Sequence, residues 1–125
     1  MTLSSLAAVA VGGALGATAR YLSYALLGQY AAMYATLAVN VSGSFLMGVL
    51  IESSGLLWSM SRDTRLFLVV GILGSFTTFS TFSLDVILLY SRGKLLLCAL
   101  YIVSSTILSI GALAVGMQLI RWLTR

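Results

Sequence analysis

The chain has 125 residues, of which 60% are hydrophobic and 8% are charged, and it contains no proline and no histidine. A soluble domain carries about 25% charged residues, so this composition excludes an ordinary soluble fold. With no histidine, one cysteine and three acidic residues, the chain cannot build a histidine-based triad, a zinc cluster or a thiol pair. We therefore expect that it is not an enzyme, and the composition favours transport or permeation across a membrane.

Four apolar runs are each long enough to cross a bilayer, which takes about 20 apolar residues in a helix. The runs cover residues 3–19 (extending to 27 if Arg20 is tolerated), 33–57, 66–90 and 95–120. Aromatic residues that suit the headgroup region lie near the run ends, at Tyr30, Trp58, Tyr90 and Trp122. We predict an all-α membrane protein with four transmembrane helices per subunit, forming a single domain over residues 1–125.

The first run has some features of a cleaved signal peptide. Ala17-Thr18-Ala19 resembles a small-residue cleavage site, but the first five residues contain no Lys or Arg. A signal peptide begins with a positively charged region. We therefore interpret the first run as a retained helix.

The basic residues give the chain almost no preferred orientation. With four spans, Arg62, Arg65, Arg121 and Arg125 fall on one side of the membrane, and Arg20, Arg92 and Lys94 fall on the other. An excess of Lys and Arg on one side normally sets the topology. A near-even split predicts dual topology, in which copies insert both ways and pair antiparallel. A single, weakly coded topology is the alternative.

Polar side chains recur at regular spacing inside the apolar runs. One stripe is Thr36, Asn40 and Ser44, and another is Tyr101, Ser105 and Ser109. Residues four apart share a helix face. A third segment, residues 74–83, carries six hydroxyl side chains in ten residues. A single Ser or Thr can bond its own helix backbone, but these features together indicate the walls of a narrow polar path.

The third run has the residues of an interrupted helix. Gly71 and Gly74 precede Thr77-Thr78, and this combines backbone freedom with poor helix formers. Non-helical backbone at membrane depth persists only where it is buried in protein or lines a cavity. Its freed carbonyls would be good ligands for Na⁺. A continuous helix with a soft centre is the alternative that these residues leave open.

The groups along the polar path are mostly hydrogen-bond donors. Glu52 and Asp85 lie in the far parts of their runs, and the first run has no acid, which argues against a proton-coupled cation exporter. Asn40 offers an amide NH₂, and Phe79 and Phe82 offer ring edges with partial positive charge. This set favours a small anion, although contact with lipid or core is the simpler explanation of the two rings.

Three segments carry a resemblance to a known family. They are residues 12–21, residues 36–45 and, above all, residues 71–83, which read GILGSFTTFSTFS. On these segments the sequence resembles the CrcB/Fluc fluoride channels, and length, helix number and charge balance agree. The resemblance implies an antiparallel dual-topology homodimer with two fluoride pores and a central structural Na⁺, and a third helix that is broken mid-membrane.

The resemblance also implies roles for individual residues. The implied fluoride path consists of Asn40, Phe79, Phe82, Thr36, Ser80, Thr81, Tyr101, Ser105 and Ser109. The carbonyls of Gly74 and Thr77 would hold Na⁺. Arg20 matches an arginine near the pore vestibule, with a snorkelling helix-end arginine as the alternative. Position 85 is Asp where the family pattern leads us to expect Glu, which puts a pore role for Asp85 in doubt.

The implied function is passive export of F⁻ through the inner membrane of a prokaryote, giving resistance to fluoride. Its partners would be fluoride, the lipid bilayer and a second copy of the chain, with no nucleic acid. One alternative is a small multidrug exporter, which would need a carboxylate in the first helix. Another is a non-transporting membrane assembly subunit, which would not need aligned hydroxyl stripes.

Overall fold

The computed structural model describes residues 1–29 and 31–125, and these residues form helices without a strand. The elements in chain order are α1 (Leu3–Leu27), α2 (Ala32–Leu56), α3 (Arg62–Arg65), the π-helix η1 (Leu66–Leu73), α4 (Gly74–Phe76), α5 (Phe79–Ser91) and α6 (Leu95–Leu123). Tyr30, which we expected at a membrane interface, lies outside the described residues.

Four helical stretches are long and apolar enough to cross a membrane: Leu3–Leu27, Ala32–Leu56, Arg62–Ser91 and Leu95–Leu123. The prediction of four spans is confirmed, and the first span runs to Leu27 with Arg20 inside it. Large apolar side chains such as Ile107, Ile110 and Val115 are exposed on α6. Apolar side chains on the outside are the expected pattern for helices that face lipid.

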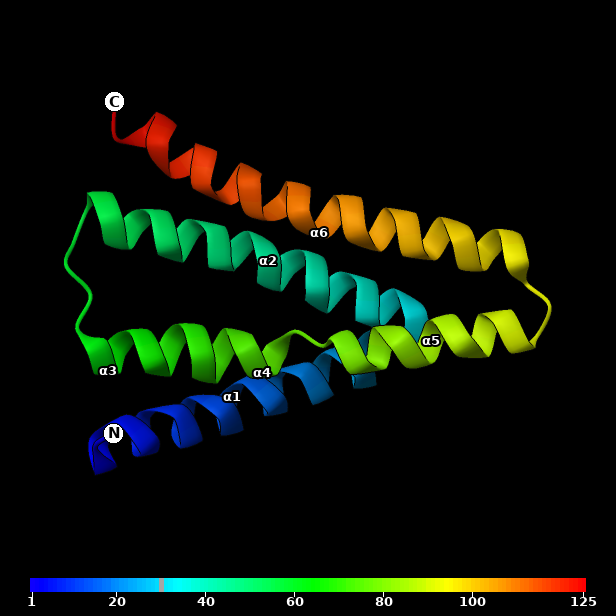
Figure 1. Cartoon of the computed structure of the whole chain (residues 1–125), viewed down its shortest axis with the longest axis horizontal. Helices are drawn as coiled ribbons and strands as arrows, with labels where there is room; N and C mark the ends of the chain where they lie inside the picture. The colour runs from blue at the N-terminus through cyan, green and yellow to red at the C-terminus, as the bar shows by residue number, and fades with distance from the viewer. Residues whose placement is uncertain (30) are drawn as a thin grey trace.

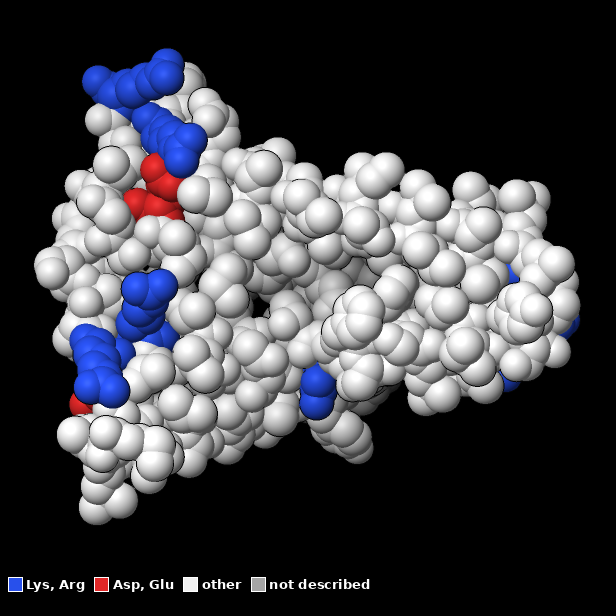
Figure 2. Space-filling view, in the orientation of Figure 1, with Lys and Arg blue, Asp and Glu red and all other residues white. Residues whose placement is uncertain are grey.

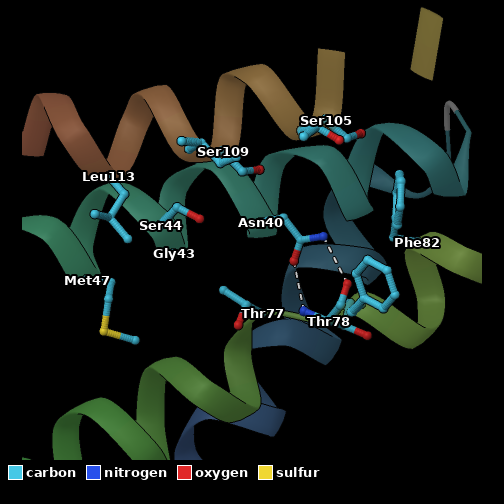
Figure 3. Close-up of a pocket in the computed structure, with 13 residues that line it drawn as sticks. Asn40, Gly43, Ser44, Met47, Thr77, Thr78, Phe82, Ser105, Ser109 and Leu113 are labelled. Carbon is cyan, nitrogen blue, oxygen red and sulfur yellow. Dashed lines mark hydrogen bonds between the residues drawn. The ribbon is translucent and has the colours of Figure 1, made fainter. Parts of the chain in front are cut away.

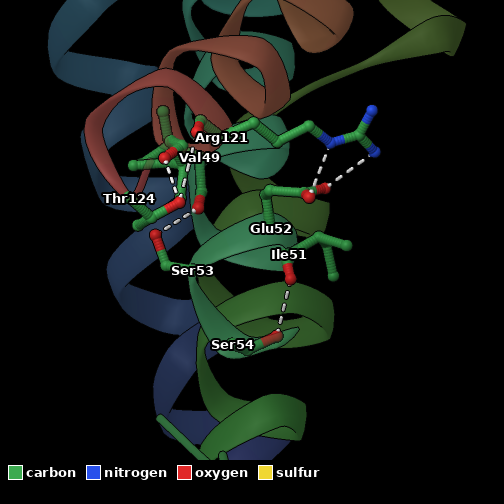
Figure 4. A network of polar contacts seen from close by, with 8 residues as sticks. Val49, Ile51, Glu52, Ser53, Ser54, Arg121 and Thr124 are labelled. Atoms are coloured by element: carbon green, nitrogen blue, oxygen red, sulfur yellow. Dashed lines mark hydrogen bonds and ion pairs between the residues drawn. The ribbon is translucent and has the colours of Figure 1, made fainter. Parts of the chain in front are cut away.

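The stretches are arranged so that α2 lies along α6, and the chain from α3 to α5 crosses α1 (Figure 1). Both termini and the α2–α3 connection lie at one end of the molecule, and the α5–α6 turn lies at the other. Basic side chains gather at the end with the termini (Figure 2). At that end Arg121 of α6 forms an ion pair with Glu52 of α2, with Nε 2.7 Å from Oε1 (Figure 4).

Glycines allow two pairs of helices to approach closely. A Cβ added at Gly71 of η1 would lie 2.8 Å from Cα of Gly12 on α1, and one added at Gly116 of α6 would lie 3.0 Å from the backbone nitrogen of Val49 on α2. Small residues at such crossings are the usual basis of helix packing in membranes. Gly111 differs, because an added Cβ there would meet nothing within 4 Å. Gly111 is therefore not at a close crossing of the described helices.

The third stretch changes conformation near its middle. Helix α4 ends at Phe76 and α5 begins at Phe79, and the two residues between have extended torsions, with φ −78° and ψ 157° at Thr77 and φ −151° and ψ 119° at Thr78. Thr78 then caps α5, since its side chain accepts a hydrogen bond from the backbone nitrogen of Thr81. The segment before α4, η1, is a π-helix, which is wider than an α-helix.

Candidate functional site

The side chain of Asn40 is bound to the backbone of Thr78 at the non-helical step. Asn40 Nδ2 donates to the Thr78 carbonyl at 2.9 Å, and the Thr78 N–H donates to Asn40 Oδ1 at 2.8 Å (Figure 3). In a continuous helix this N–H would donate to the carbonyl of Gly74, four residues earlier. Asn40 on α2 therefore takes the place of a helical partner, and we call this pair of bonds the Asn40 brace.

A pocket of about 390 Å³ lies beside the brace, between α2, the Thr77–Phe82 segment and α6. Its lining residues are Asn40, Gly43, Ser44, Met47, Thr77, Thr78, Phe79, Phe82, Ser105, Thr106, Ser109, Ile110 and Leu113. Five members of the fluoride path implied by the sequence therefore meet here: Asn40, Phe79, Phe82, Ser105 and Ser109. None of these lining residues is charged.

Ser105 carries the most informative polar atom in this pocket. Its side chain is 6% exposed, and its Oγ is buried without a hydrogen-bond partner among the described residues. A buried polar group without a partner costs free energy, which a hydrogen bond to a bound molecule or ion would offset. The hydroxyl on the pocket wall is thus available to a polar guest (Figure 3).

The aromatic rings form a tilted row that leads away from the pocket. The ring centroids of Phe79 and Phe82 are 5.5 Å apart at an interplanar angle of 46°, and those of Phe82 and Tyr101 are 5.3 Å apart at 47°. Tilted rings present edges, which carry partial positive charge, toward neighbouring groups. Phe79 is 79% exposed, so a large part of its ring is uncovered in the single chain.

Thr36 and Tyr101 lie in a second polar cluster, centred on Asp85, and do not line the pocket. Thr36 Oγ1 and Tyr101 Oη donate to Asp85 Oδ2 at 2.6 Å and 2.9 Å. Tyr24 Oη lies 2.6 Å from Thr36 Oγ1. Since the carboxylate engages both hydroxyl hydrogens, these two side chains are not free donors in this arrangement. Sequence reasoning missed Tyr24, because nothing in its spacing on the first run marks it as a partner of the second.

Ser80 and Thr81, also implied members of the path, lie at the start of α5. Thr78 Oγ1 is 3.2 Å from Ser80 Oγ and 3.1 Å from Thr81 Oγ1, to which it donates. Neither residue is among those that line the pocket. Their hydroxyls belong to the cap of α5, directly after the Asn40 brace.

The non-helical step leaves backbone carbonyls outside the helical hydrogen-bond pattern. The N–H that would occupy the Gly74 carbonyl is held by Asn40, and the extended torsions at Thr77 take its carbonyl out of the helical pattern. Carbonyl oxygens freed in this way suit a hard cation. No group of three or more His, Cys, Asp or Glu side chains that could hold a metal is found in residues 1–29 and 31–125.

The side chain of Arg20 reaches the non-helical backbone at Thr77. Its Nη1 lies 3.5 Å from the Thr77 carbonyl. Arg20 is seven residues before the end of α1 at Leu27, which is about 10 Å along a helix axis. It therefore lies in the body of α1 and not at a helix end, which weakens its interpretation as a simple end anchor.

Known proteins of one family match this chain over nearly its whole length. Residues 7–117 match the family described as CrcB-like protein, Camphor Resistance (CrcB). The chain is 51% identical over 117 residues to the fluoride-specific ion channel FluC of Rhodospirillum centenum, covering 91% of this chain and 93% of that protein. It is 46% identical to the FluC of Nitrobacter winogradskyi, with the same coverage, and 48% identical to that of Agrobacterium fabrum, covering 92% and 94%.

Proposed function

Since the chain belongs to the CrcB family, we propose that it forms a passive, fluoride-selective channel. The relatives named above carry the name fluoride-specific ion channel. The observation in this chain that supports the proposal best is the pocket beside the Asn40 brace, with an unpartnered Ser105 hydroxyl and no charged residue in its lining.

The pocket chemistry suits a small, strongly hydrated anion. An amide NH₂ has two hydrogens, and Asn40 uses one on the Thr78 carbonyl, so the other is available. With the hydroxyls of Ser105 and Ser109 and the edges of Phe79 and Phe82, it can replace part of the water around F⁻. Conduction also requires that the ion can leave, and the absence of Lys and Arg from this lining avoids a tight ion pair.

The working unit that we propose is an antiparallel homodimer of dual topology. Its basis is the near-even split of Lys and Arg between the two sides. In such a dimer the uncovered Phe79 ring, 79% exposed in one chain, would be covered by the second copy. The third span would be broken at mid-membrane by Thr77 and Thr78.

The cofactor that we propose is a structural Na⁺ on the dimer axis. The carbonyls of Gly74 and Thr77 from the two chains would hold it, and the ion would supply positive charge near the path of an anion. Arg20 would add a second positive group beside Thr77. The contribution of the chain itself is the Asn40 brace, which keeps the Gly74 carbonyl free of its helical donor.

Such a channel would protect a cell without an energy source. HF enters by diffusion and dissociates inside, and a passive path lets F⁻ leave down its electrochemical gradient. We place the protein in the inner membrane of a bacterium, as the organisms of the relatives suggest. The chain would need no catalytic residue for this activity.

The test is F⁻ efflux from liposomes that contain purified variants. Ser105→Ala should lower F⁻ flux at least about tenfold, because a hydrogen bond to a charged partner contributes about 1.5–3 kcal/mol. Ser104→Ala is the matched control, since Ser104 Oγ donates to the carbonyl of Tyr101 in its own helix. Phe82→Ile should also lower flux, whereas Phe67→Ile should not, since Phe67 does not line the pocket. Equal flux in all four variants would place the path elsewhere.

A further inference from the structure

A second cavity, of about 490 Å³, lies near the α5–α6 turn, at the opposite end of the molecule from the termini. It is formed by the start of α2, the end of α5 and the start of α6. Its lining residues are Ala31, Ala32, Met33, Tyr34, Asp85, Leu88, Leu89, Arg92, Lys94 and Leu97. None of them lines the pocket beside the Asn40 brace.

Two cations stand at the rim of this cavity. Arg92 and Lys94 flank Gly93, whose φ of 71° is the left-handed conformation that favours glycine. The turn is fixed by hydrogen bonds from Gly93 N to the Tyr90 carbonyl at 2.9 Å and from Lys94 N to the Leu89 carbonyl at 3.0 Å. Both side chains are exposed, and the chain positions of Glu52 and Asp63 put those acids near the other end of the spans.

The walls between the rim and the interior are apolar. Leu88 is 41% exposed and Leu97 is 37% exposed, so both present apolar surface that an acyl chain can contact. The whole cavity is at the end of the spans, where α5 stops at Ser91 and α6 starts at Leu95. A cavity with cations at the membrane interface and leucines toward the bilayer matches the chemistry of an anionic phospholipid.

We propose that this cavity binds an anionic glycerophospholipid, with the phosphate held by Arg92 and Lys94 and an acyl chain along Leu88 and Leu97. Asp85 closes the inner end. It lies on α5 seven residues before Arg92, the residue that follows this helix, which is two helical turns or about 10 Å. Its Oδ2 already accepts bonds from two hydroxyls. Repulsion from this carboxylate favours an anionic headgroup at the rim, beside Arg92 and Lys94.

The N-termini of α2 and α6, near the rim, also favour a negatively charged group. The first residues of α2 and α6 have no side-chain cap from Ala31 or Lys94, whereas α1, α3 and α5 are capped by Thr2, Ser61 and Thr78. Uncapped helix starts carry partial positive charge.

The experiment measures lipid binding by native mass spectrometry of the purified protein in detergent. The probes are dioleoyl phosphatidylglycerol and dioleoyl phosphatidylcholine, with inorganic phosphate as a third. The test variant is R92Q/K94Q. The control variant is R62Q/R65Q, which removes two exposed cations from the other end and leaves the cavity intact.

Wild type and R62Q/R65Q should bind phosphatidylglycerol more tightly than phosphatidylcholine. A basic residue near an anionic surface contributes about fivefold in affinity, so R92Q/K94Q should lose about 25–30-fold for phosphatidylglycerol and little for phosphatidylcholine. Loss of equal size in both double variants would overturn the proposal, because it would show only a general attraction between basic ends and acidic lipid. Equal binding of both lipids by wild type, or competition by inorganic phosphate alone, would also overturn it. Leu97→Ala should weaken phosphatidylglycerol binding if the acyl chain lies where we propose. The outcome does not depend on fluoride transport.

Discussion

Removal of the Asn40 brace is the perturbation with the clearest predicted consequence. Asn40→Ala deletes the two bonds to Thr78, at 2.9 Å and 2.8 Å. Thr78 is only 6% exposed, so its N–H and carbonyl would lose their partners in a nearly dry environment. Each unsatisfied group costs about 1–3 kcal/mol, which gives a destabilisation of about 2–6 kcal/mol if nothing else moves.

The chain has one way to reduce that cost. Thr78 N–H can return to the Gly74 carbonyl if Thr77 and Thr78 adopt helical torsions and join α4 to α5. This would satisfy the backbone but withdraw the Gly74 carbonyl from any sodium ion and change the pocket wall. Asn40→Ala should therefore either lower the unfolding midpoint or straighten the third stretch, and F⁻ flux should collapse in both cases.

Amide hydrogen exchange over residues 71–83, together with the unfolding midpoint of the purified protein, distinguishes these outcomes. A straightened helix should slow exchange at Gly74–Phe79 relative to wild type, and an unsatisfied step should speed it. Asn40→Asp keeps the Oδ1 acceptor but sets an oxygen against the Thr78 carbonyl in place of the NH₂ donor, so it should not restore the stability lost in Asn40→Ala. Ser42→Ala is the control on the same helix, because Ser42 Oγ donates to the carbonyl of Ala38. If Asn40→Ala matches Ser42→Ala in midpoint, exchange and flux, the brace has no structural role and the reasoning is wrong.

Two further predictions concern the packing of the helices. Gly71→Ala places a Cβ 2.8 Å from Cα of Gly12 and should destabilise the protein by about 1–3 kcal/mol. Gly111→Ala has open space around the added Cβ, so it should be neutral or stabilise the protein by up to about 1 kcal/mol through helix propensity. Equal thermal unfolding midpoints for the two variants would refute this. Glu52→Gln removes the ion pair between Glu52, whose side chain is 12% exposed, and Arg121, whose side chain is 51% exposed; because the guanidinium is in contact with solvent, the unfolding midpoint should fall only slightly and F⁻ flux should be unchanged. A larger loss in either measurement would show that the pair does more than join α2 to α6.

The membrane architecture could be predicted from the sequence because it depends on composition over long windows. Runs of about 20 apolar residues are decisive in this class of protein, and the four spans follow from them. The tolerance of Arg20 within α1 was left open by the sequence. The structure shows why it is tolerated, since the guanidinium reaches a backbone carbonyl, that of Thr77.

The division of the polar side chains into two clusters was beyond the reach of sequence periodicity. Tyr101, Ser105 and Ser109 share one face of α6, but they extend over about 12 Å of helix. Over that length the neighbours change, so Tyr101 meets Asp85 while Ser105 and Ser109 meet the pocket. Spacing identifies a face, but only the packing of the other helices determines what each residue on the face contacts. For the same reason the pairing of Asn40 with the Thr78 backbone could not be predicted.

The most direct test of the central claim is the selectivity of the purified protein in liposomes. Vesicles loaded with equal concentrations of F⁻ and Cl⁻ are made permeable to potassium with valinomycin, and the release of each anion is followed with its own electrode. We predict rapid release of F⁻ and retention of Cl⁻, with no requirement for a proton gradient or ATP. Equal release of both anions, or no release of F⁻ from vesicles that contain folded protein, would contradict the account.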